Sequence, residues 1–369
     1  MIPLTKPDIH FDEVAEDIRA ILDSGWLTNG RYVRLFEEIF AEYVGVDYAI
    51  STTSATTALH LALEASGVGS DDEVLVSDFT FPASGNSIVQ AGAKPVLVDC
   101  EPGKFTFSVD DAVKKITTKT KAIMPVDPFG QPANMKAICC LAEEYGLVVI
   151  EDAACAVGAE GDGKRSGAWP GVGCFSFHPR KVITTGEGGM ITTDDAGIAE
   201  RARRLRSHGG NPGVTGMTFV KNGYNYRMSE IQAALGLAQM KKLDFMLEKR
   251  RHISAAYSKQ LSEIGGVSFP LDSEGRMGTF QSYVVLLDDD VDRDELVVRL
   301  RGEGIETTLG TYAMHAQAAF SRFGYIVGDL PNSLRAQNQS LSLPIYTEMT
   351  DEDIAAVADC VAIAIRELR

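Results

Sequence analysis

The chain has 369 residues, of which 45% are apolar and 23% are charged, and its formal net charge is −16. This composition is typical of a globular protein, and the length predicts two or three domains rather than one small core. An acidic excess with no basic block excludes a nucleic-acid surface, although a few arginines in a cleft would still suffice to bind a small anion.

The cysteines and histidines predict neither a disulfide framework nor a metal site. The six cysteines form no Cys-x-x-Cys pair, and the six histidines show no metal-ligand spacing. Residues 158–165 nearly match the sequence motif of a phosphate-binding loop, but Arg165 occupies the position where the motif needs Ser or Thr to bind magnesium. No apolar leader and no membrane-spanning run is found. We therefore expect a cytoplasmic protein with reduced thiols and no membrane partner.

The first part of the chain alternates helices, turns and one short strand. Apolar residues recur at helical spacing over residues 11–24, and a second amphipathic helix follows. The turn between them contains Trp26 and Thr28, and it either packs against the domain body or lines a pocket. A strand at residues 48–50 then leads into the hydroxyl-rich stretch 51–59, which opens a helix. That stretch is either a phosphate site at a helix N-terminus or a run of N-caps.

Short continuous apolar runs then alternate with helical patterns. Strands are expected at residues 74–76, 95–98, 122–126, 147–150 and 188–193. This alternation predicts an α/β protein with a mostly parallel sheet that helices cover on both faces. Ligands of such sheets gather at the carboxyl ends of the strands, and Phe81, Asp152 and Ser176 all fall at such ends.

The second half of the chain predicts a junction between two domains. A basic helix near residues 201–206 precedes a glycine-rich loop that is expected to extend through residue 218. One long helix is predicted from Ser229 to about residue 260. It would join a large domain (1–245) to a smaller C-terminal α+β domain (246–369). Further elements are expected at residues 282–287 (strand), 293–301 (helix) and 351–367 (helix).

One lysine, Lys181, lies in an apolar, turn-rich stretch. A lysine there loses hydration, and a neutral amine can attack a carbonyl to form a Schiff base, whereas an arbitrary lysine is a solvated surface group. Ser176, five residues earlier, can offer its hydroxyl to a phosphate. The glycine-rich turn at residues 186–189 lets the backbone approach a ligand closely. A lysine beside a phosphate cradle indicates pyridoxal phosphate.

Other residues match the remaining needs of that cofactor, which are a carboxylate at the pyridine nitrogen and a partner for the ring. Asp152 follows an apolar strand and is either that carboxylate or a helix N-cap. Phe81 either stacks on the ring or packs in the core. Thr56 and Ser176 supply groups for the phosphate, and Asn225 is more polar than a simple connection requires.

These motifs resemble those of the DegT/DnrJ/EryC1/StrS family of sugar aminotransferases, which belongs to fold type I of the pyridoxal phosphate enzymes. The resemblance covers nearly the whole chain. The motifs that carry it lie at residues 54–59, 151–154, 175–177 with Lys181, 186–189, 223–228, and Tyr312 with His315.

The resemblance implies a role for each candidate residue at the cofactor. Lys181 forms the Schiff base, Asp152 holds the pyridine nitrogen and Phe81 stacks on the ring. Thr56 and Ser176 hold the phosphate. Asn225 reaches the phosphate bound in the neighbouring subunit, so a homodimer with its active site at the interface is expected.

Three positions depart from the family pattern. Ala55 stands where the family usually has glycine in the phosphate-binding turn. Cys155 stands where glutamine or histidine is common beside the ring oxygen, and a thiol is a weaker donor than either. Asp127 falls where a histidine is common. The positions that would line the substrate pocket are Trp26, Thr28, Tyr312 and His315.

Lys181 also decides between two branches of the family, because a dehydratase branch carries histidine in its place. The resemblance therefore implies amino transfer, from an amino acid such as glutamate to a nucleotide-linked keto sugar, in polysaccharide or lipopolysaccharide biosynthesis. An NDP-4-keto-6-deoxyhexose is the first choice of substrate. The alternatives are a 3-keto sugar, a keto-cyclitol and, in a different class, a regulator that binds pyridoxal phosphate without turnover.

Overall fold

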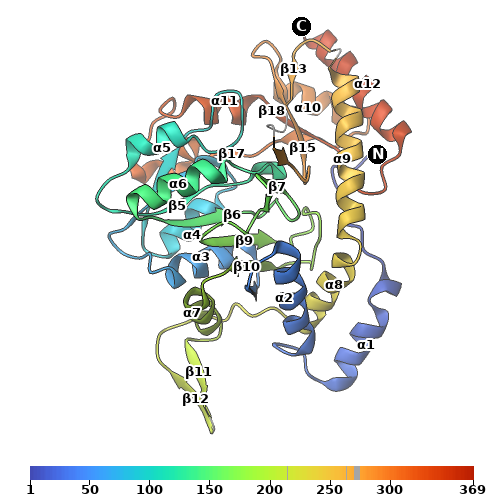
Figure 1. The fold of residues 1–369 in the computed structure, drawn as a ribbon. Coiled ribbons are helices and arrows are strands. Elements are labelled where there is room, and N and C mark those ends of the chain that lie inside the picture. The colour runs from blue at the N-terminus through green and yellow to red at the C-terminus, as the bar shows by residue number, and fades with distance from the viewer. Residues whose placement is uncertain (214, 263, 270–274) are drawn as a thin grey trace.

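The computed structural model describes residues 1–213, 215–262, 264–269 and 275–369. Its larger part is built on a seven-stranded sheet of order β1-β10-β9-β6-β5-β2-β4 (Figure 1). The strands are β1 (Tyr48–Thr52), β2 (Glu73–Ser77), β4 (Lys94–Val98), β5 (Thr120–Met124), β6 (Val148–Asp152), β9 (Val172–Ser176) and β10 (Gly189–Thr193). Only β10 runs antiparallel to its neighbours, so the predicted mostly parallel sheet is confirmed.

Helices cover both faces of this sheet. Successive residues of a strand point to opposite faces, so neighbours on β6 pack beneath different helices. Ile150 packs in the core beneath α3 (Ala55–Ala65), α4 (Ala83–Gln90) and α7 (Ala196–Arg206). Its neighbour Val149 packs in the core beneath α5 (Val109–Lys115) and α6 (Met135–Tyr145). A third core joins the sheet to α2 (Arg31–Val44) and α8 (Glu230–Met240). Both faces of the strands are therefore apolar, which explains their continuous hydrophobic runs.

The N-terminal helical segment agrees with the sequence pattern. A 3-10 helix (Phe11–Glu13) leads into α1 (Ala15–Ser24), which ends at Gly25. Gly25 adopts a φ of 66°, the left-handed conformation that closes many helices and that glycine adopts without strain. The helix predicted over residues 11–24 is therefore confirmed.

The C-terminal residues form a smaller antiparallel sheet of order β13-β15-β18-β16. Its strands are β13 (Val267–Ser268), β15 (Tyr283–Leu287), β16 (Thr308–Leu309) and β18 (Ser340–Leu343). The helices α9 (Leu243–Leu261), α10 (Arg293–Gly302) and α12 (Asp351–Leu368) share one core with it. The domain boundary predicted at residue 245 falls inside α9 and stays a prediction.

The long helix predicted from Ser229 to residue 260 is wrong. The chain leaves the helical conformation at Lys242 (φ −121°, ψ 10°), which separates α8 from α9. The ammonium group of Lys242 lies 2.7 Å from carboxylate oxygens of both Asp8 and Glu13. The break therefore coincides with a contact to the N-terminal segment, and neither proline nor glycine marks it in the sequence.

The glycine-rich loop predicted up to residue 218 is also wrong. The described residues there form an antiparallel hairpin of β11 (Gly210–Gly213) and β12 (Gly216–Phe219), and residue 214 lies outside the description. The hairpin projects from the body of the molecule beyond α7 (Figure 1). Glycine-rich strands carry little of the β-branched signal by which strands are recognised, so sequence patterns read them as loops.

The close approach of α2 and α8 yields a stability prediction. A Cβ added at Gly236 would lie 2.6 Å from the ring of Phe36, which is fully buried between Phe40 and Phe177. Helix propensity alone would make Gly236→Ala stabilising by about 1 kcal/mol. Overpacking costs roughly 1–3 kcal/mol when the neighbour cannot move. We therefore expect net destabilisation, measured as the free energy of unfolding in urea.

The matched control is Gly302→Ala, at the end of α10, where an added Cβ would meet no atom within 4 Å. That variant should be as stable as the unmodified protein or slightly more stable. Equal stability of the two variants would contradict the proposed tight contact between α2 and α8.

Candidate active site

The carboxyl ends of β1, β6 and β9 meet at one edge of the large sheet. Thr52 at the end of β1 pairs with Gly189 of β10, which pairs in turn with Ser176 at the end of β9. Asp152 at the end of β6 pairs with Cys174 of β9. Paired residues on adjacent strands point to the same face, so Asp152 and Ser176 both face the side covered by α3 and α4. Two of the three residues predicted at strand ends, Asp152 and Ser176, are therefore brought together.

Asp152 is a buried carboxylate, with only 4% of its surface exposed. The hydroxyl of Ser84, on α4, donates a hydrogen bond to its Oδ2 (2.6 Å), and the Ala154 N–H donates to its Oδ1 (3.2 Å). Burial raises the pKa of Asp152, while these hydrogen bonds and the charge of Lys181 oppose that rise. A cationic ring nitrogen would stabilise this carboxylate. Ser84 was not identified from the sequence, because a serine in a helix carries no signal of its own.

Lys181 lies in the loop that follows β9, and its Nζ donates a hydrogen bond to Cys155 Sγ at 2.9 Å. The loop is fixed by side chains from distant parts of the chain. Gln239 of α8 exchanges hydrogen bonds with the backbone of Thr184 (2.9 and 2.5 Å), and Gln281 donates to the Arg180 carbonyl (2.6 Å). These two glutamines position the lysine, and no local motif marks them in the sequence.

The N-terminus of α3 presents a site for an anion. Ser54 caps the helix by accepting the Thr57 N–H (3.2 Å), which leaves the N–H groups of Ala55 and Thr56 in the first turn without a carbonyl partner in their own helix. A side chain at Gly189 would clash with the Ser54 carbonyl, so glycine there lets the helix start against β10. Ser176 lies beside that glycine in the sheet. This arrangement fits a phosphate group.

Phe81 supplies an apolar surface at the same edge. It follows the short strand β3 (Phe79–Thr80), and 66% of its surface is exposed, which is unusual for so large an apolar side chain. β3 pairs with β17 (Tyr312–Ala313), and the rings of Phe81 and Tyr312 meet edge to face at 6.4 Å. An exposed aromatic ring near a buried carboxylate can stack on a flat ligand.

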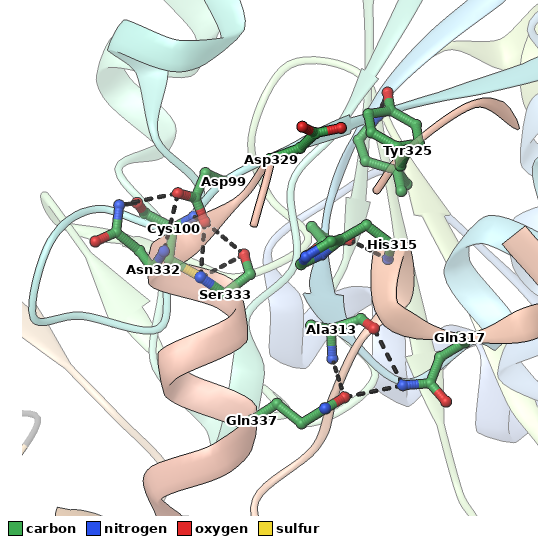
Figure 2. Close-up of polar contacts among 12 residues, drawn as sticks. Asp99, Cys100, Ala313, His315, Gln317, Tyr325, Asp329, Asn332, Ser333 and Gln337 are labelled. Carbon is green, nitrogen blue, oxygen red and sulfur yellow. Dashed lines mark hydrogen bonds and ion pairs between the residues drawn. The ribbon is translucent and has the colours of Figure 1, made fainter. Parts of the chain in front are cut away.

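Residues from the C-terminal part hold β17 in place. Gln337, on α11 (Pro331–Gln339), accepts the Ala313 N–H (2.9 Å) and a hydrogen bond from Gln317 (2.9 Å), as Figure 2 shows. Asp99, at the end of β4, caps the start of α11 by accepting the N–H groups of Asn332 (3.1 Å) and Ser333 (2.7 Å). The sequence indicated neither α11 nor this cap.

His315, predicted to line the substrate pocket, lies buried behind β3. Its Nδ1 is 2.6 Å from Asp78 Oδ2, its N–H donates to Asp78 Oδ1 (2.7 Å), and both side chains are fully buried. Burial raises the pKa of Asp78, and the hydrogen bond with His315 opposes that rise. Within the described chain, the Nε2 of His315 has no hydrogen-bond partner. His315 therefore supports the segment that carries Phe81 and does not open to solvent.

The remaining candidates lie on two exposed segments. Trp26 is 65% exposed, and Thr28 pairs with Ser229 in an isolated bridge. Asn225 is exposed and pairs with Ser207 at the end of α7. No hydrogen bond or ion pair between described residues joins Trp26, Thr28 or Asn225 to Lys181 or Asp152. Among the described residues of a single chain, therefore, no polar contact connects these three to the lysine.

Two further carboxyl groups lie behind Asp152, on the opposite face of the sheet. Asp127 accepts hydrogen bonds from Ser166 Oγ (2.6 Å) and the Ala133 N–H (2.8 Å), and Glu151 accepts the Gly167 N–H (2.8 Å). Burial raises the pKa of both. The charge of Asp127 and the hydrogen bond between the two groups raise the pKa of Glu151 further. These effects favour the protonated form of Glu151.

This pair predicts a pH dependence of stability. An acid whose pKa is raised by folding stabilises the folded state at low pH and loses that contribution as the pH rises towards the folded-state value. Glu151→Gln keeps a donor for Asp127 but removes the titration. We expect the free energy of unfolding to fall less steeply between about pH 5 and 7 in the variant, by up to about 1.4 kcal/mol per pH unit.

Chemical denaturation at several pH values measures this difference. Glu143→Gln, an exposed position on α6, serves as the control and should reproduce the slope of the unmodified protein. If Glu151→Gln also keeps that slope, Glu151 is not the protonated member of the pair.

Three further observations concern the described part of the chain. No group of three metal-ligating side chains occurs there, and none of its helices combines the length and apolarity needed to span a membrane. The loop-like residues 158–165 form paired strands, β7 (Glu160–Gly161) and β8 (Lys164–Arg165), rather than a phosphate-binding loop.

Comparisons with known proteins agree with this geometry. Residues 9–362 match the model of the DegT/DnrJ/EryC1/StrS aminotransferase family. The chain is 40% identical over 340 residues to GDP-perosamine synthase of Caulobacter vibrioides, a match that covers 91% of each protein.

Solved structures of sugar aminotransferases and related enzymes superpose closely on the chain. DesV of S. venezuelae, in complex with a ketimine intermediate, superposes with a TM-score of 0.93 at 32% identity over 98% of each chain. The PLP-form of the putative sugar aminotransferase Spr1654 of Streptococcus pneumoniae gives 0.94 at 26% identity, covering 100% of this chain and 99% of that one. The predicted fold type I architecture is confirmed.

Proposed function

The chain belongs to the DegT/DnrJ/EryC1/StrS aminotransferase family, and on that premise we propose that it binds pyridoxal phosphate through Lys181 and transfers an amino group to a nucleotide-linked keto sugar. The observation that carries the proposal is the pairing of a half-buried lysine with a buried carboxylate, Asp152, at the ligand-binding edge of a parallel sheet.

The residues present fit this cofactor. Asp152 would hold the protonated pyridine nitrogen, and Phe81 would cover one face of the ring. The free N–H groups of Ala55 and Thr56, together with the hydroxyl of Ser176, would bind the phosphate. Cys155 would lie beside the ring oxygen, since its sulfur contacts Lys181 Nζ.

The bound cofactor supplies an electron sink for the charge left when a proton leaves a substrate carbon. The chain's contribution is acid–base chemistry and orientation. Lys181 Nζ would accept the proton that leaves the substrate carbon as a general base and would return it as a general acid. Asp152 would keep the ring nitrogen protonated, because its carboxylate is buried and accepts hydrogen bonds from two neutral donors, Ser84 and the Ala154 N–H.

For the substrate, we propose an NDP-4-keto-6-deoxyhexose as amino acceptor and glutamate as amino donor, with a 3-keto sugar or a keto-cyclitol as alternative acceptors. The name of the Caulobacter relative specifies a GDP-linked sugar, which supports a nucleotide-linked acceptor. Trp26, Thr28 and Tyr312 have exposed side chains that can contact it, while His315 would act from behind through Asp78.

We further propose a cytoplasmic homodimer with the active site at the interface. A two-stranded hairpin is marginally stable alone in water, yet the β11–β12 hairpin carries exposed apolar side chains. These are Met217, Phe219 and Val220. A second copy of the chain would cover them and bring Asn225 to its phosphate.

The first experiment is an absorption spectrum of the purified protein before and after glutamate, followed by a panel of nucleotide keto sugars. A yellow protein that bleaches with glutamate and recovers its colour with one sugar supports amino transfer and identifies the acceptor. A bound cofactor that glutamate leaves unchanged would favour the regulator instead.

Lys181→Ala should abolish turnover, with a loss of at least about 10³-fold, because it removes both the attachment point and the general base. The measurement is the rate of amino transfer to the sugar identified above. Lys164→Ala, which changes an exposed lysine on β8, should leave the rate unchanged. Substantial turnover by Lys181→Ala would refute the assignment.

Phe219→Asp should weaken the homodimer, because it places a charge on an apolar surface that we expect to be buried there. Light scattering across a dilution series should show monomer at concentrations where the unmodified protein is dimeric, with an affinity loss of at least about tenfold. Val298→Asp, on α10, is the control, since its side chain is similarly exposed (67% against 64%). Equal masses for both variants would place the interface elsewhere.

A further inference from the structure

Cys155 and Lys181 form an unusual pair of reactive side chains. The sulfur of one lies 2.9 Å from the nitrogen of the other, and both residues are half-buried, so a small solute can reach them. A thiol and an amine at this separation are close enough to react with each other once the sulfur becomes electrophilic.

The backbone holds both side chains in place. The Cys155 carbonyl accepts a hydrogen bond from Thr279 Oγ1 (3.0 Å) and packs so closely on Gly130 that a Cβ there would lie 2.8 Å from it. The Lys181 N–H donates to the His178 carbonyl (2.8 Å). Because both backbones are anchored, the sulfur and the nitrogen do not need to move far to meet.

The other cysteines differ from Cys155 in their burial or in their contact with an amine. Cys100 and Cys174 are buried, and burial raises the pKa of each thiol. Cys139 and Cys140 lie on α6 and Cys360 lies on α12. No hydrogen bond between described residues joins any of these three to an amine.

We propose that Cys155 and Lys181 form a reversible covalent sulfur–nitrogen link when the enzyme meets hydrogen peroxide. In the first step the thiol sulfur takes one oxygen atom from peroxide, giving a sulfenic acid and water. In the second step Lys181 Nζ attacks that sulfur. The S–N bond forms, the S–O bond breaks and a second water leaves. Sulfur is oxidised by two electrons, peroxide is reduced, and the protein loses two hydrogen atoms.

A dithiol reverses the link. One thiol attacks the sulfur of Cys155 and releases the lysine amine, and the second thiol frees Cys155 as the reductant closes into a disulfide. The link consumes the amine of Lys181. If the proposed function is right, the oxidised enzyme cannot attach its cofactor, and peroxide becomes a reversible inhibitor. The inference on the link itself rests only on the geometry of the pair.

The test is peptide mass spectrometry on the full-length protein after brief exposure to hydrogen peroxide. The expected product joins the peptides that contain Cys155 and Lys181, lacks two hydrogen atoms, and disappears on treatment with dithiothreitol. Cys155→Ser and Lys181→Arg should each abolish it, because serine is not oxidised and a guanidinium is a poor nucleophile. Cys140→Ser, an exposed cysteine outside the site, should keep it.

A Cys155 that stays reduced, or that is oxidised without joining Lys181, would overturn the proposal. A second arm adds pyridoxal phosphate before peroxide. Cofactor at ten times its Kd should lower the yield of the link roughly tenfold, since it engages Lys181 at about nine-tenths of the sites. A link that forms equally with and without the cofactor would leave the inference standing and count against the proposed function.

Discussion

A carboxylate buried at the carboxyl end of β6 is the constraint on which the active site depends. Removing such a charge from water costs several kcal/mol, and Asp152 recovers only part of that cost from Ser84 and the Ala154 N–H. On the other face of the sheet, burial and the charge of Asp127 raise the pKa of the neighbouring residue, Glu151, well above its usual value. Burial thus raises the pKa of two adjacent carboxyl groups, and their different neighbours determine how far: Ser84, the Ala154 N–H and Lys181 oppose the rise at Asp152, whereas Asp127 adds to it at Glu151.

The C-terminal part of the chain determines where the apolar wall of the site stands. Phe81 lies in a connection between elements of the large sheet. The strand before it, β3, pairs with β17, and Gln337 holds β17 in place. Asp99 and Asp78, both at strand ends, bind the start of α11 and His315 respectively. Buried polar networks of this kind are favourable only when nearly every group is paired, so they fix one arrangement. The position of Phe81 is therefore set from outside its own segment.

The sequence alone predicted correctly those parts of the fold that depend on local residue patterns. Continuous apolar runs identified the strands of the large sheet, and the rule on strand ends placed Asp152 and Ser176 on one edge. Prediction from the sequence failed where contacts between distant residues determine the structure. The break at Lys242 coincides with contacts to Asp8 and Glu13, more than 200 residues away. Gln239, Gln281 and Ser84 carry no motif, because an amide or hydroxyl gains its role only from the group that it meets.

Glu230 links the two exposed segments that carry Trp26 and Asn225. Its buried carboxylate accepts the N–H groups of Gly30 (2.8 Å), Tyr32 (2.9 Å) and Val33 (3.1 Å), and hydrogen bonds to a charged group stabilise by about 1.5–3 kcal/mol each. The turn that carries Trp26 is thereby fixed to the start of α8, directly after the segment that carries Asn225. In the proposed homodimer the two segments would therefore meet a partner as one unit, so that contacts to the sugar and to the phosphate are set together.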